Sequence, residues 1–313
     1  MNSLFDGDEY KYLFIDSAKK SLNDKFLIPP FSIFDTRQGY WQDRKDRWKG
    51  LGIKSELGRG ENLAYDGGIA NYDYFGVKGG AIENGTSVFD PVLCEICYRW
   101  FNIEKGKILD PFAGGSVRGV VANVLGYNYT GIDLSEEQIK ANYKNAEEIN
   151  CEMDKLKWIN DDSLNVDKYI EDNSVDMIFT CPPYFDLEVY SDKENDLSNM
   201  SYENFKKAYK EILQKCCNKL KENRFAIVVI GDVRDNKGFY RNLVDVTKEA
   251  FVEKGVGFYN DIILLNSVGT ARLRAGMQFS SGRKVVKIHQ NVLVFYKGNQ
   301  KEIKNNYVEI AGV

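Results

Sequence analysis

The chain of 313 residues has a single histidine, His289, so few residues are available for a metal site. Cys94 and Cys97 stand at the spacing of zinc and redox pairs, but no second pair lies at the distance of a zinc ribbon. Both fall within an amphipathic helix pattern over 90–101, where cysteine behaves as a small apolar residue. The sequence therefore predicts two buried helix cysteines and no metal, and its six cysteines fit a reducing compartment.

Long apolar runs are also missing. No stretch approaches the roughly 18 consecutive apolar residues of a membrane span. The first residues, from Met1 to Glu9, are acidic and lack the basic and apolar regions of a signal peptide. We therefore expect a cytoplasmic protein without a membrane partner. A hydrophobic content of 43% and an aromatic content of 13% are ample for a large core.

An excess of positive charge is missing as well. The net charge is −4 and the pI about 5.4, which counts against a nucleic-acid partner. Two stretches depart from this average. Residues 267–289 contain five basic residues and no acidic one, and residues 37–59 mix seven basic residues with acidic ones and with Tyr40, Trp41 and Trp48. Either stretch alone is typical of an ordinary solvated face.

Strand and helix patterns alternate from about Ser87 onward. The patterns predict strands over 107–110, 129–133, 157–159, 175–180, 224–230, 257–265 and 291–296. They predict helices over 90–101, 116–125, 135–150, 202–221 and 239–254. Alternation of this kind indicates an α/β protein with a mostly parallel, doubly wound sheet, whose ligands bind beyond the carboxyl ends of the strands. Residues 1–85 are rich in glycine and read as an irregular N-terminal extension.

A glycine turn follows the first predicted strand, in Asp110-Pro-Phe-Ala-Gly-Gly-Ser116. Gly114 and Gly115 let a ligand approach the backbone closely at a helix N-terminus. The glycine pattern differs from that of dinucleotide-binding turns, and the leading carboxylate of Asp110 would repel a phosphate. It suits a ligand with an ammonium group. S-adenosylmethionine carries an amino-acid moiety and no phosphate, and it is the predicted cofactor.

Carboxylates also end the next two predicted strands. Asp133 is placed to accept hydrogen bonds from both ribose hydroxyls, and Asp161 or Asp162 to accept one from the adenine amino group. Each of these residues would serve equally well, taken singly, as a helix N-cap.

Thr180-Cys-Pro-Pro-Tyr184 carries the predicted chemistry. The exocyclic amine of a base is a poor nucleophile, because its lone pair is delocalised into the ring. Acceptors at the carbonyl of Pro182 and the side chain of Cys181 would localise that pair, and the prolines hold the loop rigid. Tyr184 would stack on an extruded base. The alternative is a plain Pro-Pro loop with a packing tyrosine.

These two motifs resemble those of the S-adenosylmethionine-dependent DNA amino-methyltransferases, the N4-cytosine and N6-adenine family, and of site-specific methylases common in phages and prophages. The catalytic motif corresponds to Cys181-Pro-Pro-Tyr184, although Cys181 stands where the family has Asp, Asn or Ser, and a thiol is a weak acceptor. Residues 86–93 resemble the family segment that contacts the methionine portion of the cofactor, and residues 289–297 resemble its closing strand.

The resemblance implies a Rossmann-like methyltransferase domain over 86–300, mostly parallel with an antiparallel terminal strand, followed by a tail over 301–313. It implies a site-specific enzyme that methylates a flipped-out base of duplex DNA, as in restriction–modification systems. The catalytic residues would be Cys181, Pro182, Pro183 and Tyr184. The cofactor-binding residues would be Phe89, Asp110, Pro111, Phe112, Ala113, Gly114, Gly115, Ser116, Asp133, Leu134, Asp161, Asp162 and Thr180.

The predicted DNA contacts lie outside these motifs, because too little chain separates or follows them for a recognition domain. We expect the basic segment 267–289 to be a loop that contacts phosphates through Arg272, Arg274, Arg283 and Lys284. The opposing wall would come from residues 37–59, with Trp41 and Trp48, within the N-terminal extension. Two alternatives are open: a methyltransferase acting on RNA or a protein amide, and a catalytically inactive module that binds cofactor or DNA.

Overall fold

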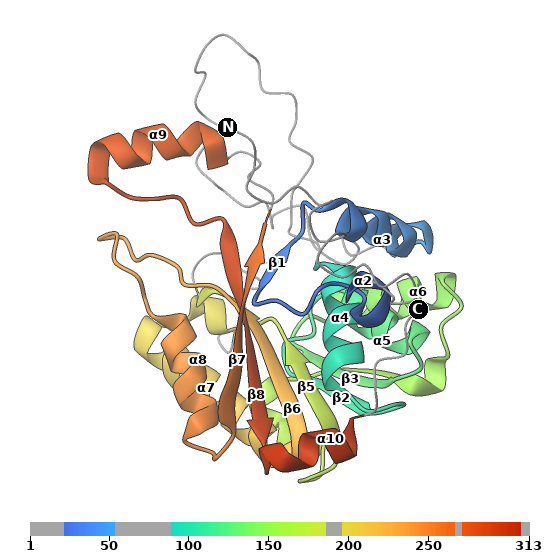
Figure 1. Cartoon of the computed structure of the whole chain (residues 1–313). Coiled ribbons are helices and arrows are strands. Elements are labelled where there is room, and N and C mark those ends of the chain that lie inside the picture. The colour runs from blue at the N-terminus through green and yellow to red at the C-terminus, as the bar shows by residue number, and fades with distance from the viewer. Residues whose placement is uncertain (1–21, 54–88, 186–195, 267–270, 308–313) are drawn as a thin grey trace.

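The computed structural model describes residues 22–53, 89–185, 196–266 and 271–307, and it arranges them as one sheet between layers of helices (Figure 1). The sheet has eight strands in the order β1-β7-β8-β6-β5-β2-β3-β4. Their bounds are Ile33–Asp35 (β1), Lys107–Asp110 (β2), Asn128–Asp133 (β3), Leu156–Asn160 (β4), Val175–Thr180 (β5), Leu220–Ile230 (β6), Gly257–Leu265 (β7) and His289–Lys297 (β8).

Neighbouring strands of this sheet are parallel except at β8, which runs antiparallel between β6 and β7. From β2 the chain moves to one side through β3 and β4, and it then returns to place β5 and β6 on the other side. The strand order therefore reverses between β2 and β5, which is where open α/β sheets bind ligands. The predicted fold, a doubly wound and mostly parallel sheet with an antiparallel last strand, is confirmed.

Helices cover both faces of the sheet. Their bounds are Leu22–Phe26 (α2), Gly39–Gly50 (α3), Pro91–Phe101 (α4), Val117–Val124 (α5), Glu136–Glu148 (α6), Tyr202–Lys219 (α7), Leu243–Val252 (α8), Ala271–Gly282 (α9) and Ile303–Asn306 (α10). One buried cluster joins α3, α4 and α5 to the sheet, and a second joins α7 and α8 to its other face. The helix α9 projects beyond the strand ends, away from both layers (Figure 1).

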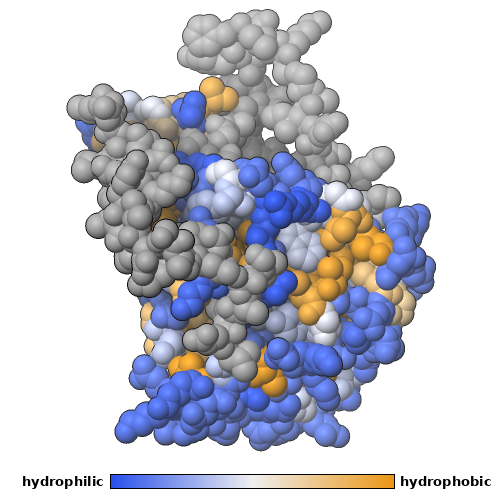
Figure 2. All heavy atoms as spheres, turned by 45° about the vertical axis from the view of Figure 1, so that its right-hand side comes forward, coloured by the Kyte–Doolittle hydropathy of each residue, from blue (hydrophilic) through white to orange (hydrophobic). Residues whose placement is uncertain are grey.

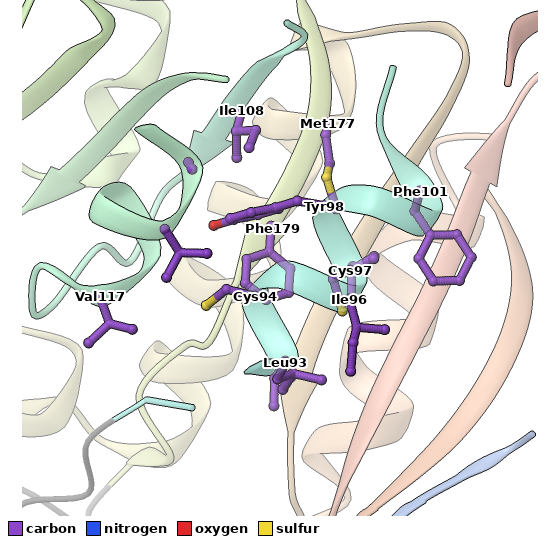
Figure 3. Close-up of a cluster of buried hydrophobic side chains, with 14 of the residues drawn as sticks. Leu93, Cys94, Ile96, Cys97, Tyr98, Phe101, Ile108, Val117, Met177 and Phe179 are labelled. Carbon is purple, nitrogen blue, oxygen red and sulfur yellow. The ribbon is translucent and has the colours of Figure 1, made fainter. Parts of the chain in front are cut away.

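The helix α4 is buried along most of its length. Asp90 caps it by accepting a hydrogen bond from the backbone N–H of Val92 at 2.9 Å, and Pro91 fits the first turn. Cys94 and Cys97 lie inside the buried cluster around α4 (Figure 3). Burial raises the pKa of both thiols, and no metal-binding group is found among the described residues. The prediction of buried helix cysteines is confirmed.

The N-terminal segment is more regular than the sequence indicates. Its described part, 22–53, supplies β1, which pairs in parallel with β7 through Ile33 and Ile263. It also supplies α3, whose Trp41 and Trp48 are 0% and 7% exposed. The prediction that these tryptophans line a DNA-contacting wall is wrong, because both are part of the core.

Two basic residues of α3 likewise form ion pairs within the protein. Arg44 forms an ion pair with Glu95 of α4 at 2.7 Å, and Lys45 forms one with Asp90 at 2.9 Å. Glu95 is 4% exposed and also accepts a hydrogen bond from Trp48 Nε1. These contacts fasten α3 onto α4. The rest of the predicted wall, 54–59, lies outside the described residues.

The described surface is mostly hydrophilic on the side seen in Figure 2, with apolar side chains gathered in a few local groups. In the described part of the chain, no helix has the length and apolar character needed to cross a membrane.

Candidate active site

The glycine turn 111–116 lies at the reversal point of the strand order, between β2 and α5. Gly114 has a φ of 50°, in the left-handed region that favours glycine. Its carbonyl accepts a hydrogen bond from Asn142 Nδ2 at 2.7 Å, and the N–H of Ala113 donates to the carbonyl of Ile132. Ser116 Oγ donates to Asn145 at 2.8 Å. The turn is therefore fixed from both the neighbouring strand β3 and the helix α6.

Asp110, which precedes the turn, is completely buried. Its carboxylate accepts hydrogen bonds from Thr180 Oγ1 at 2.6 Å, from Tyr129 Oη at 2.7 Å, from Phe112 N at 3.2 Å and from Arg118 Nε at 2.5 Å. These donors occupy the acceptor positions of the carboxylate. In this structure Asp110 holds the frame of the site together and has no acceptor position left for an ammonium group.

Asp133 ends β3 beside the same turn. One carboxylate oxygen accepts from the backbone N–H of Gly114 at 2.8 Å, and the other from that of Ser135 at 2.9 Å. Burial raises the pKa of Asp133 in spite of these two bonds. Each oxygen keeps a second lone pair, so the carboxylate can also accept hydrogen bonds from a ligand. The neighbouring Leu134 is partly buried.

The acidic pair after β4 has two different roles in the structure. Asp162 accepts from the backbone N–H of Leu164 at 2.9 Å and so caps a short 3₁₀ helix, as the N-cap alternative predicts. Asp161 accepts from Tyr169 Oη at 2.7 Å and from Asn165 Nδ2 at 2.9 Å. The bond from Tyr169 is the main reason why the pKa of Asp161 is lowered.

The Pro-Pro motif follows β5 at the neighbouring strand end. Pro182 is buried, and Cys181 and Tyr184 are partly buried. Cys181 Sγ lies 3.9 Å from Tyr184 Oη, and Gln290 Nε2 of β8 donates to the same hydroxyl at 3.0 Å. Gln290 was not predicted, because nothing in a strand pattern distinguishes it from other polar strand residues.

Backbone strain is concentrated directly after this motif. Phe185 has a φ of 62°, which a bulky residue rarely adopts. The surrounding packing holds it there, because Arg241 lies over its ring at 4.6 Å and Phe205 meets the ring edge-on at 5.1 Å. Such strain is typical of functional loops.

The hydrogen bond from Thr180 to Asp110 joins the two motifs directly. The structure therefore brings the glycine turn and the Pro-Pro motif side by side, although 70 residues separate the two bonded side chains in the sequence. Phe89 lies at the same place, edge-on to Phe179 with 5.7 Å between ring centroids. The remainder of its segment, 86–88, lies outside the described residues.

The basic segment 271–288 differs from the predicted loop, since residues 271–282 form the helix α9. The helix was missed because it has no buried residue, and therefore no apolar periodicity in its sequence. Arg272 and Arg283 are exposed, and Arg274 and Lys284 are partly buried. Residues 267–270 and 186–195 lie outside the described residues.

Lys284 and Lys287 approach the loop that follows β6. Lys284 Nζ lies beside Gly238, and Lys287 Nζ lies near Gly231 and 6.0 Å from the ring centroid of Tyr240. Arg234, which belongs to that loop, lies over the same ring, with 4.0 Å from its Cζ to the ring centroid. Burial lowers the pKa of Lys287, although Asp232 opposes this shift. These cations were not assigned a role in the sequence, with the exception of Lys284.

The residues at the strand ends fit S-adenosylmethionine. Asp133 offers two carboxylate oxygens for ribose hydroxyls, and the left-handed Gly114 leaves the backbone of the turn open to close approach. The buried Arg118 adds a positive charge next to the turn, and Phe89 adds an apolar ring. An adenosine with a zwitterionic amino-acid end matches this set of groups.

Two family models match the chain. The first describes a DNA methylase, of the N6 and N4 type, and matches residues 175–311. The second describes an RNA cap guanine-N2 methyltransferase and matches residues 105–221. Among curated proteins, none matches this chain in sequence.

Solved structures similar to the chain include TrmN from Thermus thermophilus, with 15% identity over 66% of this chain and 49% of that one, and a TM-score of 0.46. They include a candidate DNA modification methylase, also from Thermus thermophilus, with 18% identity over 44% and 51% and a TM-score of 0.33. A third is the S-adenosylmethionine-bound magnesium protoporphyrin IX methyltransferase from Synechocystis PCC 6803, with 8% identity over 66% and 76% and a TM-score of 0.40. This chain spans about half the length of the first two proteins.

Both models that match the chain describe methyltransferases, and S-adenosylmethionine is the cofactor that the family model and the residues of the site support. More particularly, the match over 175–311 confirms the resemblance to the N4/N6 DNA amino-methyltransferases that the motifs at 110–116 and 181–184 predict.

Proposed function

We propose that the chain methylates the exocyclic amino group of a base in duplex DNA, at N4 of cytosine or N6 of adenine. The base would be flipped out of the helix into the space beside Tyr184. The observation that carries this proposal is the bond from Thr180 to Asp110, because it sets the glycine turn next to the Pro-Pro motif. A site-specific enzyme of the phage type is the form that we favour.

The cofactor supplies an electrophilic methyl group when it is bound. In this proposal Asp133 holds the ribose, and Asp161 accepts a hydrogen bond from the adenine amino group at Oδ2, the oxygen that also accepts from Tyr169. The turn residues Pro111, Phe112, Ala113, Gly115 and Ser116, together with Leu134, Asp162 and Thr180, shape the pocket around the donor.

The residues of the Pro-Pro motif would act on the base. The carbonyl of Pro182 and the Sγ of Cys181 accept hydrogen bonds from the amino group, which localises its lone pair. Pro183 keeps this corner rigid. Tyr184 stacks on the base, and the hydrogen bond from Gln290 fixes the orientation of its ring. As the new C–N bond forms and the bond between the methyl group and the sulfonium sulfur breaks, the amino nitrogen would lose a proton to water.

The cations around the loop after β6 support a nucleic-acid substrate. The half-buried ammonium of Lys287 has no hydrogen-bond partner among the residues described, so an anionic ligand would stabilise it. Lys284 and Arg234 flank the same loop, and Arg272, Arg274 and Arg283 extend the positive surface along α9. These residues would contact the phosphates on either side of the flipped base.

A labelled methyl group tests this proposal. The protein would be incubated with methyl-labelled donor and, separately, with duplex DNA, single-stranded DNA, RNA and a protein extract. Mass spectrometry of nucleosides would then identify the product. We expect N4-methylcytosine or N6-methyladenine from duplex DNA, and reduced transfer by Tyr184→Ala, which should still bind the donor.

RNA is the second candidate substrate, because the RNA cap guanine-N2 methyltransferase model covers both motifs. That reaction also methylates an exocyclic amine, so the same acceptors at positions 181 and 182 would serve it. Label in guanine N2 of RNA, and none in DNA, would establish this alternative. Label in a protein amide would point to the third substrate class, and donor binding without any transfer would indicate an inactive module.

A further inference from the structure

Arg118 is a buried cation in the first turn of α5 that the sequence motifs do not include. Its side chain is 6% exposed, and the other residues of the helix are apolar or glycine except Asn123. Its Nε donates to Asp110 at 2.5 Å. Its Nη2 donates to the carbonyl oxygens of Phe112 and Ala113, in the glycine turn. The side chain thus ties the end of β2 to the turn that follows it.

The guanidinium is held in one orientation. Phe89 lies against it, with 4.7 Å from Arg118 Cζ to the ring centroid, and this contact adds to the two hydrogen-bonded nitrogens. Burial alone would lower the pKa of Arg118, but the charge and hydrogen bond of Asp110, together with the charges of Tyr129 and Cys181, outweigh burial, and the pKa is raised. The group is therefore permanently charged and fixed in place.

One nitrogen of this group remains for a ligand. Nη1 has no hydrogen-bond partner in the described part of the chain. It is not fully buried either. It therefore reaches a space that solvent or a ligand can enter. An N–H pair on a fixed cation requires an acceptor, and carboxylates match guanidinium geometry.

The place of Arg118 within the site identifies that acceptor. If Asp133 at the end of β3 holds the ribose, the amino-acid end of the donor extends toward the ends of β2 and β5, where Arg118 lies. Asp110 has no acceptor position left for the donor's ammonium group, whereas Arg118 has donors left for its carboxylate. A positive charge at this point also disfavours direct contact with an ammonium group.

We propose that Arg118 binds the α-carboxylate of S-adenosylmethionine, and that Asp110 is the positioning residue that holds Arg118 for this contact. The proposal depends on the donor site and is independent of which nucleic acid is methylated. It makes the site selective for a donor that carries a carboxylate.

Calorimetry with two ligands tests this selectivity without any nucleic acid. S-adenosylmethionine carries the carboxylate, and decarboxylated S-adenosylmethionine lacks it but keeps the sulfonium and the amino group. We expect the intact protein to prefer the first ligand by on the order of tenfold or more. Arg118→Lys keeps the charge beside Asp110 but loses the planar fork, so the preference should shrink to about twofold or less.

Two further variants separate this role from a structural one. The double variant Asp110→Asn/Arg118→Met removes both buried charges together. It should lose the preference for S-adenosylmethionine but still bind the decarboxylated ligand. Thr180→Val breaks a different hydrogen bond to Asp110 and serves as the matched control. It should weaken the binding of both ligands by the same factor and so leave the ratio of the two affinities unchanged.

The proposal is overturned if the intact protein does not distinguish the two ligands. It is also overturned if Arg118→Lys and the double variant keep the original ratio, or lose affinity for both ligands equally. Binding of the decarboxylated ligand reports that each variant is folded. A protein that shows the preference but transfers no methyl group to DNA would contradict the proposed function and leave the role of Arg118 intact.

Discussion

Replacing Asp133 by asparagine should weaken the binding of S-adenosylmethionine by about 10- to 150-fold. The carboxylate already accepts one backbone N–H on each oxygen, from Gly114 and from Ser135. In the asparagine variant an NH₂ group replaces one oxygen, so one charge-assisted bond to the ribose is lost. Such a bond contributes about 1.5–3 kcal/mol, which gives this range of dissociation constants. Asp133→Ala removes both bonds and should cost more.

Lowering the pH should also weaken the binding of S-adenosylmethionine to the intact protein. Burial raises the pKa of Asp133, so its carboxylate takes up a proton at a higher pH than an ordinary aspartate. The protonated form has lost an acceptor, and donor affinity should therefore fall as the pH drops through this raised pKa. The asparagine variant cannot titrate at this position, and its affinity should lack that part of the pH dependence.

Isothermal titration calorimetry at several pH values measures both effects, and thermal unfolding monitors the fold. Asp154→Asn is the matched control, because Asp154 is exposed and lies just before β4, near the start of β3 and β4, whereas Asp133 lies at the end of β3. Equal donor affinity in the intact protein and in Asp133→Asn would refute the assignment of the ribose site.

Four other changes have defined outcomes. Tyr184→Ala should lose about 1–3 kcal/mol of binding to a duplex with an unpaired target base, while Tyr184→Phe keeps the ring and loses only the bond from Gln290; equal binding by all three proteins would exclude stacking. Cys181→Ser should retain methyl transfer in a labelled-donor assay, because serine is a better acceptor of similar size, and an inactive variant would show that position 181 is not an acceptor. Alanine at Arg272, Arg274 and Arg283 should weaken DNA binding and flatten its dependence on log salt in fluorescence anisotropy, with donor affinity unchanged; parallel lines of equal affinity would show that α9 is only solvated surface. Glu95→Gln should lower the free energy of unfolding by about 1.5–3 kcal/mol above pH 5. Burial opposes ionisation of Glu95, but its bonds with Arg44 and Trp48 lower its pKa below the usual value, so this contribution is present above the pKa of an unfolded glutamate and disappears as the pH falls through the lowered one; identical urea unfolding curves at neutral pH would contradict it.

The parts of the fold that the sequence predicts are those with a clear apolar period. The strands at 107–110 and 175–180 were predicted with the bounds that the structure shows, since each is a short buried run that ends at a polar residue. The strand β1 was missed because it has only three residues, and its partner β7 lies about 230 residues further along the chain. Such an edge strand is defined only by its hydrogen bonds to a strand that is distant in the sequence.

The candidate site shows the same limit. Residue types and spacing located Asp110 and Thr180 at strand ends, but they could not show that the two side chains bond to each other. Arg118 lies eight positions after Asp110, and its presence as a charged residue in a mostly apolar helix was the available signal. Hydrogen bonds between side chains on different elements depend on rotamers and packing, which a sequence pattern does not contain.

The attachment of α3 to α4 has a thermodynamic consequence. Asp90 caps α4, accepts hydrogen bonds from Trp41 and Lys45 of α3, and directly follows Phe89, whose ring lies against Arg118. The docking of α3 and the occupancy of the donor site therefore share one segment of backbone. Such linkage is reciprocal: if the docked helix favours the donor, the bound donor stabilises the docked helix by the same free energy. The N-terminal segment is then a component of donor affinity, although none of its described residues lies in the candidate site.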